Sequence, residues 1–132
     1  MVGYDASDCA RAALGSAVEV AGAFGDEVHV VVVYEVSRLG GEVADFAAAL
    51  RERAQHVGEL ARDQASGLHA EVTVEVEEGP IAEAIATVAE RLDARMIVVG
   101  TRGEGPLRGA LIGSTPHRLI QQTSRPVLVV PG

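Results

Sequence analysis

Residues 96–103 read Met-Ile-Val-Val-Gly-Thr-Arg-Gly, and this stretch says most about the fold. An uninterrupted run of apolar residues is typical of a strand that is buried on both faces, as in a parallel sheet. A glycine directly after such a strand lets the backbone approach a ligand closely, because glycine has no Cβ. The stretch therefore predicts a central parallel strand that ends at Gly100 beside a functional loop.

Strand patterns and helical patterns alternate along the chain on both sides of this stretch. Strands are predicted at residues 2–4, 28–34, 69–77, 96–99 and 127–130. Apolar residues recur at helical spacing over residues 10–21, 43–60 and 81–92, and a short last helix begins at 114. This order favours a doubly wound, Rossmann-like α/β fold, with a mostly parallel five-stranded sheet and helices on both faces. We expect one domain over residues 1–132, with ligands bound at the carboxyl ends of the strands.

The third predicted strand differs from the others because valine alternates there with polar residues. Glu71, Thr73 and Glu75 fall on one face of it. A solvated acidic face suits the edge of a sheet, where it discourages pairing with other chains. We therefore interpret Glu75, Glu77 and Glu78 as a solvated edge and not as a metal site.

The composition argues against several classes of function. The net charge is −8, from 11 basic and 19 acidic residues, which disfavours nucleic acid and anionic membranes as partners. All the basic residues are arginines, so Schiff-base chemistry, a lysine general base and a P-loop lysine are excluded. The single cysteine cannot form an internal disulfide, and no apolar run approaches the length of a membrane span. We expect a cytoplasmic protein.

The loop after residue 99 carries the strongest functional pattern. It reads Gly100-Thr101-Arg102-Gly103, then nine residues, then Gly113-Ser114-Thr115. Glycines at 103 and 113 allow conformations that aim N–H groups into one concavity. Ser114 and Thr115 begin a helix, whose free N–H groups favour an anion, and their hydroxyls can bind phosphate oxygens or magnesium. The pattern predicts a triphosphate cradle; its alternative, a glycine-rich surface loop without a ligand, is disfavoured by the position between strand and helix.

Several side chains near this loop keep two interpretations. Asp5, at the end of the first predicted strand, could contact a ligand or cap the next helix. Arg102 and Arg108 could pair with phosphates or remain solvated. Cys9, near the start of the first helix, is either a packed small side chain or a thiol of low pKa.

Catalysis has little support in the sequence. Ser114 and His117 have the spacing of neighbours on a helix surface, but no third group is available to orient the imidazole. A serine at a helix start is more often a cap. The loop supplies binding groups without a base or a water-positioning residue, so we expect slow hydrolysis of a bound nucleotide or none.

The chain resembles the universal stress protein family, specifically its ATP-binding branch. Gly100, Gly103, Gly113 and Ser114 match that branch's signature of G, two residues, G, nine residues, then G and Ser or Thr. The resemblance covers essentially the whole chain. It includes the opening Gly3-Tyr4-Asp5-Ala6-Ser7, the stretch Gly79-Pro80-Ile81, and residues 97–100 and 125–130.

The resemblance implies a bound ATP, with magnesium accompanying it, and a role for each matching residue. Asp5 would contact ribose or adenine, Val33 would pack on adenine, and Val99 flanks the first glycine. The glycines at 100, 103 and 113, with Ser114 and Thr115, would line the ribose and phosphates, while Arg102 falls at a variable position. Ala6 stands where the family often has glycine, and Arg95 where it often has aspartate.

The resemblance also implies a function and an assembly. We expect an ATP-binding stress-response or regulatory module that forms a homodimer through the last strand, residues 127–130. Two alternatives remain at this point: a nucleotide-free interaction module of the same fold, and a weak ATPase or adenylating enzyme of related fold.

Overall fold

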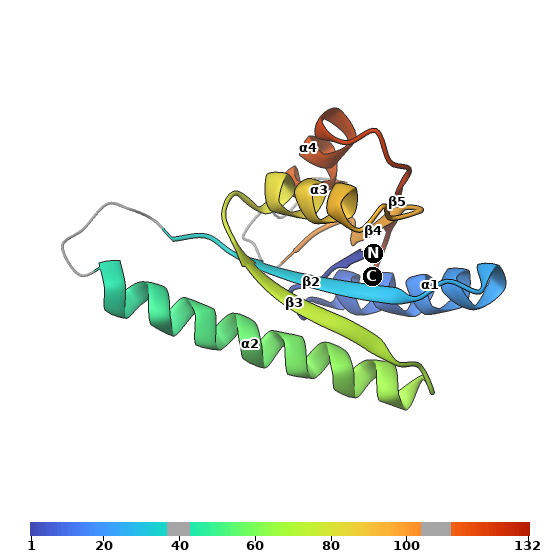
Figure 1. Ribbon diagram of the computed structural model, residues 1–132, viewed down its shortest axis with the longest axis horizontal. Helices are drawn as coiled ribbons and strands as arrows, with labels where there is room; N and C mark the ends of the chain where they lie inside the picture. Colours follow the sequence, from blue (N-terminus) through green and yellow to red (C-terminus); the bar gives the residue numbers. More distant parts are fainter. Residues whose placement is uncertain (37–42, 104–111) are drawn as a thin grey trace.

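The fold is a parallel sheet between two pairs of helices (Figure 1). The computed structural model describes residues 1–36, 43–103 and 112–132. The strands are β1 (Val2–Gly3), β2 (Val28–Tyr34), β3 (Val72–Glu78), β4 (Ile97–Gly100) and β5 (Val127–Val130). The helices are α1 (Asp8–Phe24), α2 (Val43–Gly67), α3 (Ile81–Arg91) and α4 (Ser114–Gln122). The predicted fold class is confirmed.

The sheet has the strand order β3-β2-β1-β4-β5, and every neighbouring pair is parallel. The chain first builds the sheet outward from β1 to β3 and then returns to add β4 on the other side of β1. The winding direction therefore reverses between β1 and β4. In sheets of this kind ligands bind at that reversal, beyond the carboxyl ends of the strands.

Two apolar cores fill the spaces between the sheet and the helices on its two faces. Helices α1 and α2 cover one face, and α3 and α4 cover the other (Figure 1). Because successive strand residues point to opposite faces, Val30 belongs to the first core and Val31 to the second. Leu14 of α1 and Leu119 of α4 are fully buried in these two layers. Both faces of the central strands are thus covered, as their unbroken apolar runs predict.

A serine cap and a left-handed glycine mark the two ends of α1. The side-chain oxygen of Ser7 accepts a hydrogen bond from the Ala10 N–H at 3.2 Å and caps the helix. Gly25 ends it in the left-handed conformation, with φ of 70°. No helix within the described ranges is both long and apolar enough to cross a membrane.

The structure corrects some predicted boundaries and burial. The third strand begins at Val72 and not at 69, because a turn after α2 places His69 in the left-handed region, with φ of 55°. The first strand ends at Gly3, one residue earlier than predicted. Phe46 and Leu92 belong to predicted apolar helix stripes, yet they are 54% and 39% exposed.

Strand β3 is an edge strand, as predicted, but its acidic face is not simply solvated. The Glu75 side chain is only 21% exposed. One of its oxygens lies 2.7 Å from His29 Nε2, and Arg91 of α3 donates to the other. Burial, and then the hydrogen bond and charge of Glu75, raise the pKa of the neighbouring Glu77. Glu77 is therefore harder to ionise in the folded protein than in the unfolded chain.

This pKa shift predicts a pH-dependent stability. A carboxyl whose pKa is raised by folding favours the folded state at low pH, and that contribution is lost as pH rises through the raised pKa. Glu77→Gln, which cannot ionise, should unfold at a higher temperature than the wild type at pH 7, by about 1–3 °C. The gain should shrink below the ordinary pKa of glutamate. Circular dichroism melts across pH measure it, and an equal gain in the exposed control Glu78→Gln would contradict the assignment to Glu77.

Candidate functional site

A cavity of about 640 Å³ opens at the carboxyl ends of β1 and β4, where the winding of the sheet reverses. Its size is in the range of small-molecule sites. All the residues predicted to bind a ligand line it: Asp5, Val33, Val99, Gly100, Arg102, Gly103, Gly113, Ser114 and Thr115. Arg108, the other arginine considered for the phosphates, lies outside the described residues. The fold thus brings together residues that are more than 100 positions apart in the sequence.

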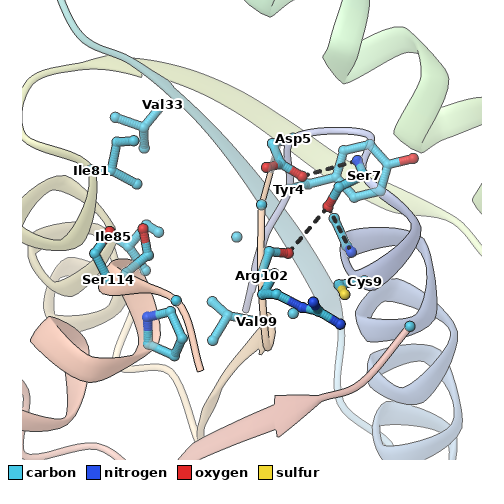
Figure 2. A pocket seen from close by; sticks show the side chains of 18 of the residues that line it. Tyr4, Asp5, Ser7, Cys9, Val33, Ile81, Ile85, Val99, Arg102 and Ser114 are labelled. Atoms are coloured by element: carbon cyan, nitrogen blue, oxygen red, sulfur yellow. Dashed lines mark hydrogen bonds between the residues drawn. The ribbon is translucent and has the colours of Figure 1, made fainter. Parts of the chain in front are cut away.

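The cavity has an apolar side and a polar side. Figure 2 shows Val33, Ile81 and Ile85 on one side, with Asp5 and Arg102 across from them. Ile81 is 40% exposed, so its predicted place in the buried stripe of α3 is wrong, and it faces the cavity instead. Sequence reasoning missed Ile81 and Ile85 as site residues. Their i, i+4 spacing at the start of a helix that follows a strand end was the available signal.

The turn between β1 and α1 fixes the side chain of Asp5. The Ser7 N–H donates to Asp5 Oδ1 at 3.0 Å, while the Ser7 hydroxyl caps the helix. Of the two interpretations of Asp5, the structure therefore rejects the helix cap, because Ser7 has that role. Between them, Ala6 has a φ of 66°, a left-handed conformation that residues with a Cβ adopt at a cost.

The strained turn predicts that Ala6→Gly will not harm the fold. Glycine adopts a left-handed φ without the steric cost, though it loses more entropy on folding, so we expect a gain of up to about 1 kcal/mol in the free energy of unfolding. Urea denaturation measures this. The control is Ala48→Gly on an exposed position of α2, which should lose roughly 1 kcal/mol. Equal losses in both variants would show that the Ala6 backbone is not strained.

The starts of α1 and α4 differ in a way that matters for anions. Helix α1 is capped by Ser7, but α4 begins after Gly113 with no side-chain hydrogen bond to its first turn. The first N–H groups of a helix need partners, and an uncapped start is suited to an anion. The hydroxyls of Ser114 and Thr115 lie at this same start. The α4 end of the cavity therefore presents main-chain N–H groups together with two hydroxyls.

Space restricts the signature glycines more than conformation does: a Cβ would clash at Gly100 and Gly103 and would be tight at Gly113. Among the described glycines only Gly25 and Gly79 have a φ in the left-handed region, so the expected special conformations at 103 and 113 are absent. A Cβ on Gly100 would lie 2.5 Å from the Cβ of Cys9, so its absence lets α1 pack on β4. This differs from the predicted reason, which was close approach of a ligand.

Cys9 is packed in this contact. The residue is 8% exposed, and its Sγ lies 3.5 Å from Thr101 Oγ1. The hydrogen bond with Thr101 is the main reason that the pKa of the thiol is lowered, against the opposite effect of burial. This burial confirms that Cys9 is a packed side chain. The pKa of its thiol is lowered as well, so the two interpretations do not exclude each other.

The charges around the cavity are mainly negative. The ionisable carboxylates that line it are Asp5 and Asp8, and Arg102 is the cation among the described lining residues. His117 is not part of this lining, although Ser114 is. A polyanionic ligand at the α4 end would therefore need positive charge from elsewhere.

The chain is similar in sequence to known proteins over nearly its whole length. A family model described as the universal stress protein family matches residues 1–131. A universal stress protein of Methanocaldococcus jannaschii is 32% identical over 131 residues, which cover 96% of this chain and 77% of that protein.

Solved structures share the fold. The universal stress protein UspA from Lactobacillus plantarum superposes with a TM-score of 0.86 at 21% identity, covering 98% of this chain and 94% of that one. A universal stress protein from Archaeoglobus fulgidus, solved in complex with dAMP, has a TM-score of 0.72 at 25% identity, covering 98% and 94% of the two chains.

Proposed function

Because the chain belongs to the universal stress protein family, we propose that it binds ATP in this cavity and acts as a nucleotide-dependent stress-response or regulatory module. One observation carries the proposal: a single cavity joins an apolar wall to an uncapped helix start. A nucleotide has two parts that match these: a base with apolar ring faces and an anionic phosphate chain. The dAMP complex of the Archaeoglobus fulgidus relative supports an adenine nucleotide as the ligand class.

The geometry suggests how the ligand would lie. The adenine would pack against Val33, with Ile81 and Ile85 completing the apolar wall. The ribose would face Asp5, whose carboxylate can accept hydrogen bonds from hydroxyls. The phosphates would reach the start of α4, where main-chain N–H groups and two hydroxyls are available.

Magnesium fits this arrangement on grounds of charge and ligand type. Lining carboxylates outnumber the one described lining cation, so a triphosphate needs a further positive charge. Magnesium is commonly held by phosphate oxygens together with a few protein oxygen ligands, and the Ser114 and Thr115 hydroxyls at the start of α4 would supply these. When bound, the ion would neutralise phosphate charge. Since the assigned side chains supply binding groups only, we propose slow hydrolysis or none.

The proposal predicts magnesium-dependent affinity at the α4 end. ATP should bind more weakly without magnesium, and the double variant Ser114→Ala/Thr115→Val should lower ATP affinity by roughly tenfold or more, because each hydroxyl would bond a charged group. Adenosine, which lacks phosphates, is the control ligand and should bind the double variant and the wild type alike. Isothermal titration calorimetry measures all of these affinities.

A direct test separates this function from a nucleotide-free interaction module. Protein purified without added nucleotide is denatured, and the released small molecules are examined by mass spectrometry. We expect an adenine nucleotide. Absence of any released nucleotide, together with no calorimetric ATP binding, would contradict the proposal.

We also propose that the protein forms a homodimer through β5. This strand pairs only with β4 among the described strands, and Leu128 is 37% exposed. The carbonyls of Pro126 and Val130 accept hydrogen bonds from the β4 side, so alternation leaves the main-chain groups of Val129 on the open edge. An open apolar edge favours pairing with a second copy.

The edge contact predicts that proline at 129 will weaken the dimer. Val129→Pro removes an N–H that faces outward, and it should shift the protein toward monomer in sedimentation velocity. Val129→Thr keeps both the N–H and the branched shape, and it should dimerise as the wild type does. An undiminished dimer in the proline variant would rule out this edge as the interface.

A further inference from the structure

We propose that Gly103 determines specificity for the nucleoside half of the ligand and that it acts through the carboxylate of Asp5. This inference rests on the proposed function. The signature alone assigns its glycines together to the ribose and the phosphates. The structure gives each of them a different neighbour, and only at Gly103 is that neighbour a side chain assigned to the nucleoside.

The contact between Gly103 and Asp5 leaves no room for a side chain. A Cβ on Gly103 would lie 2.5 Å from Asp5 Oδ2, closer than such atoms approach in folded proteins. Alanine at this position would therefore have to displace either the carboxylate or the loop. Both are held in place.

The carboxylate is held by the turn that carries it. Asp5 Oδ1 accepts the hydrogen bond of the Ser7 N–H at 3.0 Å, so the side chain cannot rotate away without losing this bond. Ser7 is itself fixed, because its hydroxyl caps α1 and its carbonyl accepts from the Arg11 N–H at 2.9 Å. The Asp5 carboxylate thus has a defined position on the cavity wall.

The loop is held from two further directions. The Thr101 N–H donates to the Val130 carbonyl of β5 at 2.9 Å. The Thr101 carbonyl accepts from the Gly113 N–H at 2.6 Å, which joins the loop to the start of α4. Gly103 lies two residues beyond this anchored point, and the carbonyl of Arg102, directly before it, accepts a hydrogen bond from the Ser7 hydroxyl at 3.5 Å.

The other signature glycines have neighbours of another kind. Gly100 faces Cys9 and Ala10 of α1, and a Cβ on Gly113 would lie 3.2 Å from the Thr101 carbonyl oxygen. Neither contact involves Asp5. Gly113 directly precedes the uncapped start of α4, so it belongs to the phosphate side of the cavity. It is the matched control for Gly103, since φ is outside the left-handed region at both.

The experiment is a double-mutant cycle read with ligand fragments. Gly103→Ala and Gly113→Ala are made in the wild type, and Gly103→Ala is also made in an Asp5→Ala background. Adenosine and inorganic tripolyphosphate are titrated by calorimetry, the latter with magnesium. Gly103→Ala should weaken adenosine about tenfold and leave tripolyphosphate nearly unchanged, while Gly113→Ala should do the reverse. In the Asp5→Ala background, Gly103→Ala should have no further effect on adenosine.

A ligand-free melting experiment separates the two proposals. Gly103→Ala should lower Tm in the wild type and lower it much less once the Asp5 carboxylate is removed. If the wild type binds ATP but Gly103→Ala weakens only tripolyphosphate, or if its effect adds to that of Asp5→Ala, this inference is overturned and the proposed function stands. If the wild type binds neither ATP nor adenosine, the proposed function fails and the assignment to the nucleoside fails with it, even where the melting data show the contact.

Discussion

The close approach of α1 to the end of β4 is the constraint on which the site depends. A Cβ on Gly100 would lie 2.5 Å from Cys9 Cβ and 2.7 Å from the Cys9 carbonyl carbon. Only glycine allows the first turn of α1 to rest on the strand end at this distance. As a result, the turn that carries Asp5 and the loop that carries Gly103 emerge side by side, although almost 100 residues separate them in sequence.

The two halves of the cavity are chemically different because one helix start is capped by a side chain and the other is not. On the α1 side the helix start is already capped by Ser7, so the group presented to the cavity is a carboxylate, Asp5. On the α4 side no side chain caps the helix, so main-chain N–H groups are presented instead. One helix start therefore offers acceptors and the other offers donors. A ligand with hydroxyls at one position and phosphates at another matches this polarity.

The absence of lysine limits the positively charged groups that can bind an anion in the cavity. Among the described lining residues, Arg102 is the cation and Asp5 and Asp8 are carboxylates. In the proposed complex, main-chain N–H groups and an accompanying metal ion would therefore balance the negative charge of the phosphates. Two of the described arginines outside the cavity hold structural ion pairs. Arg125 binds Glu90 and Asp93, and Arg95 binds Asp26 while its guanidinium lies 4.4 Å from the ring centroid of Phe24.

The sequence by itself determined the fold class, the order of elements and the strand that leads into the site. Apolar runs and helical spacing are local signals, and they predicted the order of strands and helices, with β4 leading into the loop. Burial at the ends of elements was less predictable: the pattern alone could not show that Ile81 faces a cavity or that Phe46 lies open to solvent.

What each glycine is for was decided only by the tertiary structure. Spacing identifies Gly100, Gly103 and Gly113 as a group, but it cannot show that one touches Cys9, another Asp5 and the third Thr101. Likewise, Glu75 looked solvated until Arg91 and His29 were brought beside it. The physical reason is the same in each case. The effect of a missing Cβ or of a charged group depends on the atoms next to it, and those atoms come from distant parts of the chain.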